Sequence, residues 1–153
     1  MDWTSAPATQ DGVTHREFTV AVGGRMVPVA LCTLPEVDAD AIGWYGVSMG
    51  TAYGLPLVAS EPRIRAAALG MWGLSYPNSG RLAEDAPRVR CPALFQQKWG
   101  DEIFSRESQI DLFDKLGSQD KRMTVYMGGH RNPEGEQLDE IFTFLLSRLH
   151  CAR

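Results

Sequence analysis

A serine, an aspartate and a histidine follow one another along the chain, each placed just past a predicted strand. Ser48 lies in a Gly-x-Ser-x-Gly sequence at residues 46–50, Asp101 follows segment 91–99, which has a strand-like core, and His130 follows the apolar segment 123–127. A serine hydroxyl becomes a nucleophile when a histidine removes its proton and a carboxylate orients the imidazole. These residue types in this order therefore suit acyl transfer through a serine.

The sequence around Ser48 predicts a nucleophile elbow, a sharp turn between a strand and a helix that exposes the serine hydroxyl. Gly46 and Gly50 fit this turn, because we expect a side chain at either position to crowd the turn or the packing of helix against strand. The backbone N–H of Met49, the residue after the serine, is the expected oxyanion donor. A bare Gly-x-Ser-x-Gly match also arises by chance, so the downstream residues decide the interpretation.

Both downstream residues lie at the predicted carboxyl ends of strands. Asp101 follows Gly100 after one strand, and His130 follows Gly128 and Gly129 after the next. The carboxyl ends of parallel strands share one rim of an open sheet, so residues far apart in the sequence can converge there.

These motifs, together with residues 37–43 ahead of the elbow, resemble the alpha/beta-hydrolase superfamily, specifically its small serine esterases and dienelactone-hydrolase-like members. The resemblance covers about residues 42–149. It implies an α/β protein with a shortened alpha/beta-hydrolase fold, in which a mostly parallel sheet carries flanking helices and an antiparallel N-terminal hairpin. Dienelactone hydrolases proper use a cysteine nucleophile, so a serine at this position favours the broader ester hydrolases of the fold.

The resemblance also assigns roles to individual residues. It implies Ser48 as nucleophile, His130 as general base and Asp101 as the acid that orients the imidazole. Asp101 is preferred to its neighbour Glu102, because the family places its carboxylate directly after the glycine of the strand and most often uses the shorter side chain. Asp85 is a more distant candidate for the acid.

The front half of the sequence departs from the family pattern. Residues 16–34 read as two strands around a Gly23-Gly24 turn, and an acidic connector then leads almost directly into the elbow strand. Two parallel strands and their helices, with the loop that supplies a second oxyanion donor, are therefore expected to be missing. Loss of one such donor costs about 3 kcal/mol of transition-state stabilisation, which predicts slow turnover. The elbow strand is expected to have an unpaired edge, which the hairpin or a homodimer would cover.

The remaining patterns predict helices and strands around this site. We expect helices at 49–59, at 106–116 after an N-cap at Ser105, and from Pro133 after a cap at Asn132. Segment 64–74 is predicted as a strand and 75–90 as a loop in the position of a hydrolase lid. The residues expected on buried helix faces are Ile110, Phe113 and Leu116 for the second helix, and Leu138, Ile141, Phe142, Leu145 and Leu149 for the last.

Three further side chains carry predictions of their own. Pro56 is expected to kink or end the first helix early, because proline lacks the N–H that a helix interior needs. Trp72 and Trp99 are candidate substrate-binding residues, with ordinary core packing as the alternative for both.

Composition narrows the class of protein. With 153 residues and 44% hydrophobic residues, we expect a single domain at 16–153 after a flexible segment at 1–15. A net charge of −4 without a basic cluster disfavours nucleic acid as a partner. No secretory signal is recognised, and the longest apolar stretch, 66–74, is too short to span a membrane. Three widely spaced cysteines favour reduced thiols in the cytoplasm, with a small buried residue as the expected role of Cys91.

The histidines do not show the spacing of zinc ligands, so neither a metal nor another cofactor is expected. The sequence thus predicts a cytoplasmic serine hydrolase that cleaves a small carboxylic ester, with thioesters and small lactones equally open to the same residues. Transfer of an acyl group to peroxide is a second enzymatic possibility. The alternative from another class is a catalytically weak or inactive shortened homologue that acts as a binding or interaction module.

Overall fold

The computed structural model describes residues 2–3, 8–10, 13–15, 18–19, 38 and 40–149. The chain divides into two compact units, residues 1–39 and 40–153. In the first unit, two antiparallel pairs of strands form: β1 (Asp2–Trp3) with β4 (Phe18–Thr19), and β2 (Ala8–Gln10) with β3 (Val13–His15). The hairpin predicted at 16–34 lies almost wholly outside the described residues. The flexible segment 1–15 and the domain 16–153 stay predictions.

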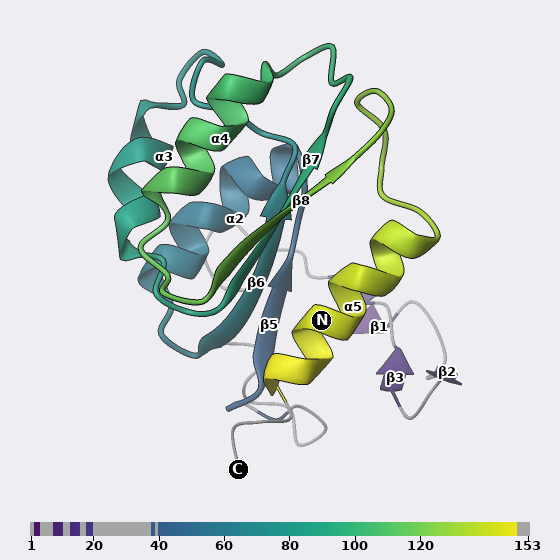
Figure 1. The fold of residues 1–153 in the computed structure, drawn as a ribbon. Helices are drawn as coiled ribbons and strands as arrows, with labels where there is room; N and C mark the ends of the chain where they lie inside the picture. The colour runs from purple at the N-terminus through teal and green to yellow at the C-terminus, as the bar shows by residue number, and fades with distance from the viewer. Residues whose placement is uncertain are drawn as a thin grey trace. The chain divides into compact units, whose positions relative to one another are not determined.

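The second unit contains a parallel sheet of four strands between two layers of helices, as Figure 1 shows. The strands stand in the order of the sequence: β5 (Ile42–Tyr45), β6 (Ile64–Gly70), β7 (Ala93–Lys98) and β8 (Lys121–Tyr126). On one face lie α2 (Met49–Ser60), α3 (Gly80–Asp85) and α4 (Arg106–Lys115), and on the other lies α5 (Glu136–Leu149). This arrangement confirms the predicted α/β class.

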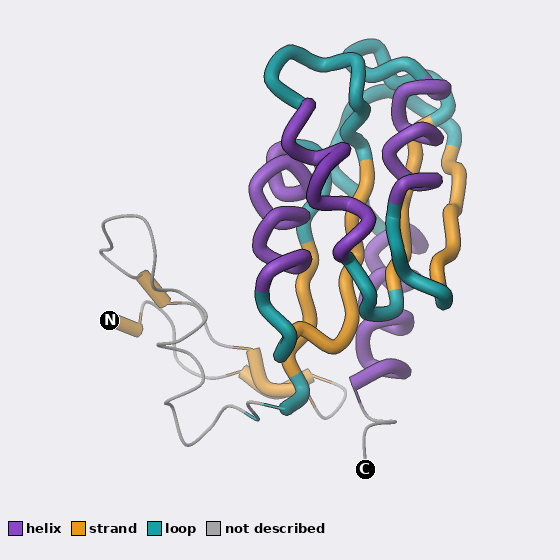
Figure 2. Tube along the Cα trace, turned by 90° about the vertical axis from the view of Figure 1, so that its left-hand side faces the viewer, coloured by secondary structure: helices purple, strands orange, loops and turns teal. Residues whose placement is uncertain are grey.

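The two central strands, β6 and β7, are buried on both faces of the sheet. All residues of β7 are buried, and β6 is buried except at Arg65. Residues 66–69 of β6 and 93–95 of β7 are apolar without alternation, which is typical of parallel strands covered on both faces, because no side chain there points to water. The small residues Ala66, Ala67 and Ala68 of β6 let the helices approach the sheet closely. Figure 2 shows the loops that leave the carboxyl ends of the strands gathered above the sheet, at the top of the view.

Helix α2 begins at Met49, as predicted, but Pro56 does not end it early, since the helix continues to Ser60. The proline removes only one hydrogen bond, that to the Ala52 carbonyl, from a helix of 12 residues. Leu55 and Val58, on either side of it, are buried in the core, and this packing maintains the helix.

Helix α4 has the predicted N-cap, because Ser105 Oγ accepts a hydrogen bond of 3.2 Å from the Ser108 N–H. The predicted buried face was partly wrong. Ile110 is exposed, and the buried residues of the helix are Ser108, Gln109 and Leu112. The two polar ones are buried because they have partners: Ser108 Oγ accepts the N–H of Ser75, and Gln109 Nε2 donates to the Phe104 carbonyl.

Two other boundaries differ from the predictions. The final helix begins at Glu136 instead of Pro133, and its buried side chains include Phe144, whereas Phe142 is 43% exposed. Segment 75–90 is not a plain loop, because it contains α3 and a 3-10 helix, Ala86–Arg88. Leu82 lies among the buried core residues and fixes this short helical segment against α2.

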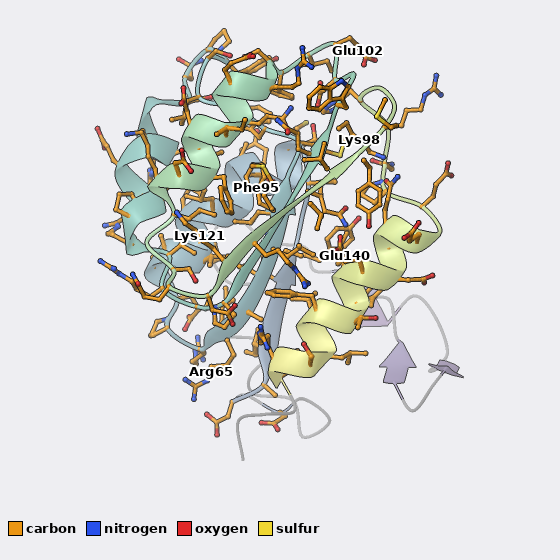
Figure 3. The ribbon with its side chains drawn as sticks, viewed as in Figure 1. Arg65, Phe95, Lys98, Glu102, Lys121 and Glu140 are labelled. Atoms are coloured by element: carbon orange, nitrogen blue, oxygen red, sulfur yellow. The ribbon has the colours of Figure 1, made fainter. Side chains whose placement is uncertain are left out.

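The two faces of the sheet differ in chemistry. The face under α2, α3 and α4 has the larger apolar cluster, and the face under α5 has a smaller one. Beside the smaller cluster, Glu140 Oε2 accepts hydrogen bonds from Gln96, Thr124 and Tyr126 at 2.8–3.1 Å. Figure 3 shows Glu140 on α5 facing the end of the sheet where Lys98 lies. This network joins α5 to the carboxyl halves of β7 and β8.

Cys91 is half-buried at the start of the β7 segment, and burial raises the pKa of its thiol to about 11. A thiol with that pKa is almost wholly protonated at neutral pH and therefore a poor nucleophile. Among the described residues, no helix combines the length and apolar character that a membrane span requires.

Candidate active site

Ser48 occupies the turn between β5 and α2 with φ 54° and ψ −120°, a backbone conformation that residues other than glycine rarely adopt. Close packing between two backbone segments fixes the conformation of this turn. A Cβ atom on Gly46 would lie 2.8 Å from the Gly50 carbonyl oxygen, so only glycine fits there. The prediction for Gly50 was wrong, because a Cβ at that position meets nothing within 4 Å. A side chain at Gly46 would therefore crowd the backbone of Gly50, whereas a side chain at Gly50 would not crowd Gly46.

Thr51 locks the elbow to the neighbouring strand. Its side chain is fully buried, and Oγ1 accepts the Gly70 N–H at 2.8 Å while lying 2.6 Å from the Gly70 carbonyl and 2.9 Å from that of Gly46. The Ser48 N–H also donates to the Gly70 carbonyl, at 2.9 Å. A backbone strained by about 1–3 kcal/mol persists only where its surroundings determine it, and these contacts do so.

The structure brings the three predicted side chains into contact. Ser48 Oγ lies 2.8 Å from His130 Nε2, and His130 Nδ1 lies 2.9 Å from Asp101 Oδ2. The Asp101 side chain is fully buried and that of His130 is 14% exposed. The contacts form a continuous line from hydroxyl through imidazole to carboxylate. The roles of these residues as nucleophile, base and orienting acid stay predictions.

The histidine reaches the serine across the whole sheet. Ser48 follows β5 at one edge, whereas His130 follows β8 at the other, and three strand spacings of about 4.8 Å separate those edges by about 14 Å. The segment after β8 must therefore lean back over the ends of β7 and β6 to bring Nε2 to the hydroxyl. Because this segment has no regular secondary structure between Met127 and Gly135, its contacts with the β7 loop decide where the ring lies.

Asp101 is fixed by its own loop. Its Oδ1 accepts the backbone N–H groups of Ile103 and Phe104 at 2.9 and 3.0 Å, and its Oδ2 faces the histidine and also accepts a long hydrogen bond of 3.5 Å from Gln109 Nε2. The Phe104 ring is buried and lies 5.4 Å from the His130 ring, centroid to centroid. The imidazole is therefore bounded by a carboxylate on one side and an aromatic ring on another.

Glu102 contacts the same histidine at a different point. Its Oε2 accepts the backbone N–H of His130 at 2.7 Å, and this hydrogen bond holds the pKa of the Glu102 carboxyl below its usual range. Sequence reasoning weighed Glu102 only as a competitor of Asp101. Two neighbouring acids after a strand were the available signal, but the contact with a backbone group is visible only in three dimensions.

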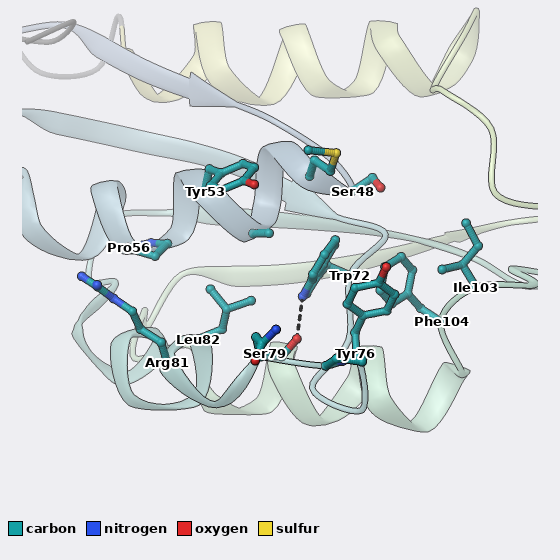
Figure 4. A pocket seen from close by; sticks show the side chains of 14 residues that line it. Ser48, Tyr53, Pro56, Trp72, Tyr76, Ser79, Arg81, Leu82, Ile103 and Phe104 are labelled. Atoms are coloured by element: carbon teal, nitrogen blue, oxygen red, sulfur yellow. Dashed lines mark hydrogen bonds between the residues drawn. The ribbon is translucent and has the colours of Figure 1, made fainter. Parts of the chain in front are cut away.

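A cavity of about 770 Å³ opens beside Ser48, between α2 and the α3 segment. Figure 4 shows the side chains that line it. Trp72 lies in its wall, where the indole N–H donates to Ser79 Oγ at 3.0 Å and the ring packs on Tyr76 and Phe104 at 4.8 and 4.7 Å. Trp99 does not line this cavity. It is 50% exposed and lies under the guanidinium of Arg106, so the structure separates the two tryptophans that the sequence grouped.

Met49 also lines the cavity, and it is the first residue of α2. The N–H groups of a first helical turn have no partner within their own helix, and they carry a partial positive charge. Among the described residues, no acceptor is bound to the Met49 N–H. In the same part of the chain, no group of three or more histidine, cysteine or acidic side chains could hold a metal ion.

The fold of this chain is similar to that of solved esterase and thioesterase structures. No protein-family profile matches the chain, and no curated protein matches it significantly. Among solved structures, a cold-adapted esterase from an Arctic intertidal metagenomic library is 40% identical, with a TM-score of 0.68 over 71% of this chain and 50% of the esterase. Acetyl xylan esterase 1 from Thermoanaerobacterium sp. JW/SL YS485 shares 18% identity, with a TM-score of 0.64 over 78% of this chain and 49% of that enzyme. Acyl-protein thioesterase 2 from Zea mays shares 18% identity, with a TM-score of 0.56 over 80% of this chain and 61% of that protein.

The parallel sheet, the elbow and these similarities together define the class: the chain belongs to the alpha/beta-hydrolase superfamily. It spans about half the length of the esterase structures that it matches.

Proposed function

We propose that this chain is a serine hydrolase that cleaves small carboxylic esters through a Ser48–His130–Asp101 triad. The observation that carries the proposal is the unbroken line of contacts at 2.8 and 2.9 Å, which begins at a serine in a strained turn beside a cavity. Similarity to an esterase at 40% identity supports ester hydrolysis as the class of reaction.

The proposed reaction begins with proton transfer from Ser48 Oγ to His130 Nε2 while Oγ attacks the ester carbonyl carbon. The carbonyl oxygen becomes an oxyanion, which the Met49 N–H stabilises at the positive end of α2. Collapse of this intermediate breaks the ester C–O bond, and Nε2 returns the proton to the departing alcohol. Asp101 keeps the other ring proton on Nδ1, so Nε2 remains the acceptor.

A water molecule then completes the cycle. It gives a proton to Nε2 and attacks the acyl carbon, and collapse releases the carboxylic acid and restores the Ser48 hydroxyl. The apolar wall of the cavity, with Trp72, Tyr76 and Phe104 in mutual contact, suits an acyl or alcohol group with an aromatic or aliphatic body. Thioesters and small lactones are chemically open to the same steps.

A fluorophosphonate probe tests the proposal on the full chain. We expect covalent labelling and hydrolysis of p-nitrophenyl acetate by the wild type, and loss of both in Ser48→Ala and His130→Ala. Ser60→Ala is the matched control, because Ser60 lies at the far end of the same helix and bonds only backbone carbonyls there. Absence of labelling in correctly folded wild-type protein would overturn the proposal in favour of a catalytically silent homologue.

We also propose a homodimer. Among the described strands, β5 has a neighbour on one side only, and unpaired parallel edges are usually covered. Sedimentation velocity at micromolar concentration should give the mass of a dimer. A stable monomer would contradict this part of the proposal without affecting the hydrolase chemistry.

A further inference from the structure

Two neighbouring carboxylates hold two different parts of one histidine. Asp101 contacts ring atom Nδ1 of His130, whereas Glu102 accepts its backbone N–H. The second contact joins the β7 loop to the β8 loop at the end of the sheet, where Figure 3 shows Glu102. Glu102 is exposed, so packing does not force it into this position.

Within the part of the chain that the structure describes, the β8 loop has few other attachments near the histidine. The Gly100 N–H donates to the Gly128 carbonyl at 2.9 Å, and Gly128 itself has a φ of 109°, which side chains disfavour. Met127 is 77% exposed and contributes little packing. The Arg131 N–H donates to the Gly129 carbonyl at 2.8 Å, but this bond stays within the loop. Among the described residues, the hydrogen bond of the His130 N–H with Glu102 is therefore the contact that ties the main chain of His130 itself to the β7 loop.

Gly129 shows how closely the carboxylate sits against this loop. A Cβ atom on Gly129 would lie 2.7 Å from Glu102 Oε2. The neighbouring atom is the end of a flexible side chain, so an alanine there would displace the carboxylate and leave the backbone in place. The same contact can thus be broken from either partner.

We propose that Glu102 is a positioning residue, which fixes the main chain of His130 so that its ring spans the distance between Asp101 and Ser48. The inference rests on the proposed function, in which this ring transfers the proton. The charge of Glu102 strengthens the contact, because a charged acceptor makes a stronger hydrogen bond than a neutral one. The hydrogen bond also lowers the pKa of Glu102, so the carboxyl stays ionised at neutral pH.

Steady-state kinetics of Glu102→Ala tests the role in catalysis. We expect kcat to fall about tenfold to a hundredfold, as for other small misplacements of a catalytic group, with little change in KM. KM is preserved because Glu102 does not line the cavity. Glu102→Gln keeps an acceptor oxygen and should recover most of kcat, whereas Gly129→Ala should reproduce the loss. Glu107→Ala, an exposed glutamate on α4, is the matched control with unchanged kcat.

Amide hydrogen exchange at His130, followed by NMR, tests the contact without any substrate. In Glu102→Ala and Gly129→Ala, this amide should exchange about tenfold faster than in the wild type, while amides of β7 keep their rates. Unchanged exchange in Glu102→Ala, or faster exchange with unchanged kcat, would overturn the inference. If the wild type shows no turnover but the exchange result holds, the proposed function fails while the anchoring of His130 by Glu102 stands.

Discussion

The elbow and the histidine loop bring their residues to the same point by different means. The elbow is fixed by buried contacts: the backbone of Gly46 packs against that of Gly50, and the buried Thr51 side chain binds both the elbow and the neighbouring strand. The histidine loop has no regular structure and is held chiefly by two acidic side chains, Asp101 and Glu102. The elbow is therefore part of the packed core, whereas the histidine loop depends on hydrogen bonds from another loop.

This difference predicts how each half responds to mutation. Changes in the elbow disturb buried backbone contacts, so they should lower stability together with activity. Asp101 and Glu102, the two acids of the β7 loop that hold the histidine loop, lie outside the apolar core, so changes there should lower activity with little loss of stability. Three experiments test this division and a fourth probes the cavity wall beside it, in order of decreasing expected effect.

Asp101→Asn should cause the largest loss of activity, because it changes the contact that orients the His130 ring. The amide cannot hold the proton on Nδ1 as a carboxylate does, and the corresponding change in serine proteases lowers kcat about 10,000-fold. Rates of p-nitrophenyl acetate hydrolysis measure the effect, and the melting temperature should change little. A melting temperature that falls as much as in the elbow variants would contradict the division.

Thr51→Val should break the elbow side. Valine has nearly the same shape but leaves the buried Gly70 N–H without an acceptor, which together with the lost hydrogen bond costs about 3 kcal/mol of unfolding free energy. Urea denaturation measures this cost, and Thr51→Ser, which keeps the hydroxyl, is the control. Equal stability of the valine and serine variants would show that the hydroxyl does not lock the turn.

Gly46→Ala and Gly50→Ala sharpen the description of the elbow as a matched pair. The first places a Cβ 2.8 Å from backbone and should cost about 2 kcal/mol through overpacking. The second meets open space in a helix and should raise stability by up to about 1 kcal/mol. Thermal unfolding of both variants checks the sign of each change. Equal destabilisation by the two would contradict the one-sided contact.

Ser79→Ala tests a residue that belongs to neither half. It removes the acceptor of the Trp72 indole N–H, which costs about 1 kcal/mol of stability. Because only the cavity wall is loosened, KM for a bulky ester should rise a few-fold while kcat for p-nitrophenyl acetate stays the same. A fall in kcat for the small ester would place Ser79 in the proton-transfer machinery instead.

The sequence predicted the elbow side in most of its parts. Ser48, the strand before it and the helix after it were all readable, because local turn chemistry determines them. Contacts between segments that are distant in the sequence could not be predicted from it. The hydrogen bond of Glu102 with His130, the separation of Trp72 from Trp99 and the burial of Phe144 instead of Phe142 all depend on how segments pack. The short helix α3 was missed because six residues are too few for a periodic pattern to emerge.

The order of the four strands has a consequence for how the molecule matures. Each strand pairs with its neighbour in the sequence, so successive strand–helix–strand units can join the sheet as they leave the ribosome. Ser48 arrives with the first strand of this series and His130 only after the last. Under the proposed mechanism, Ser48 therefore becomes reactive only when His130 docks against it, and a reagent directed at this serine would report the completion of folding.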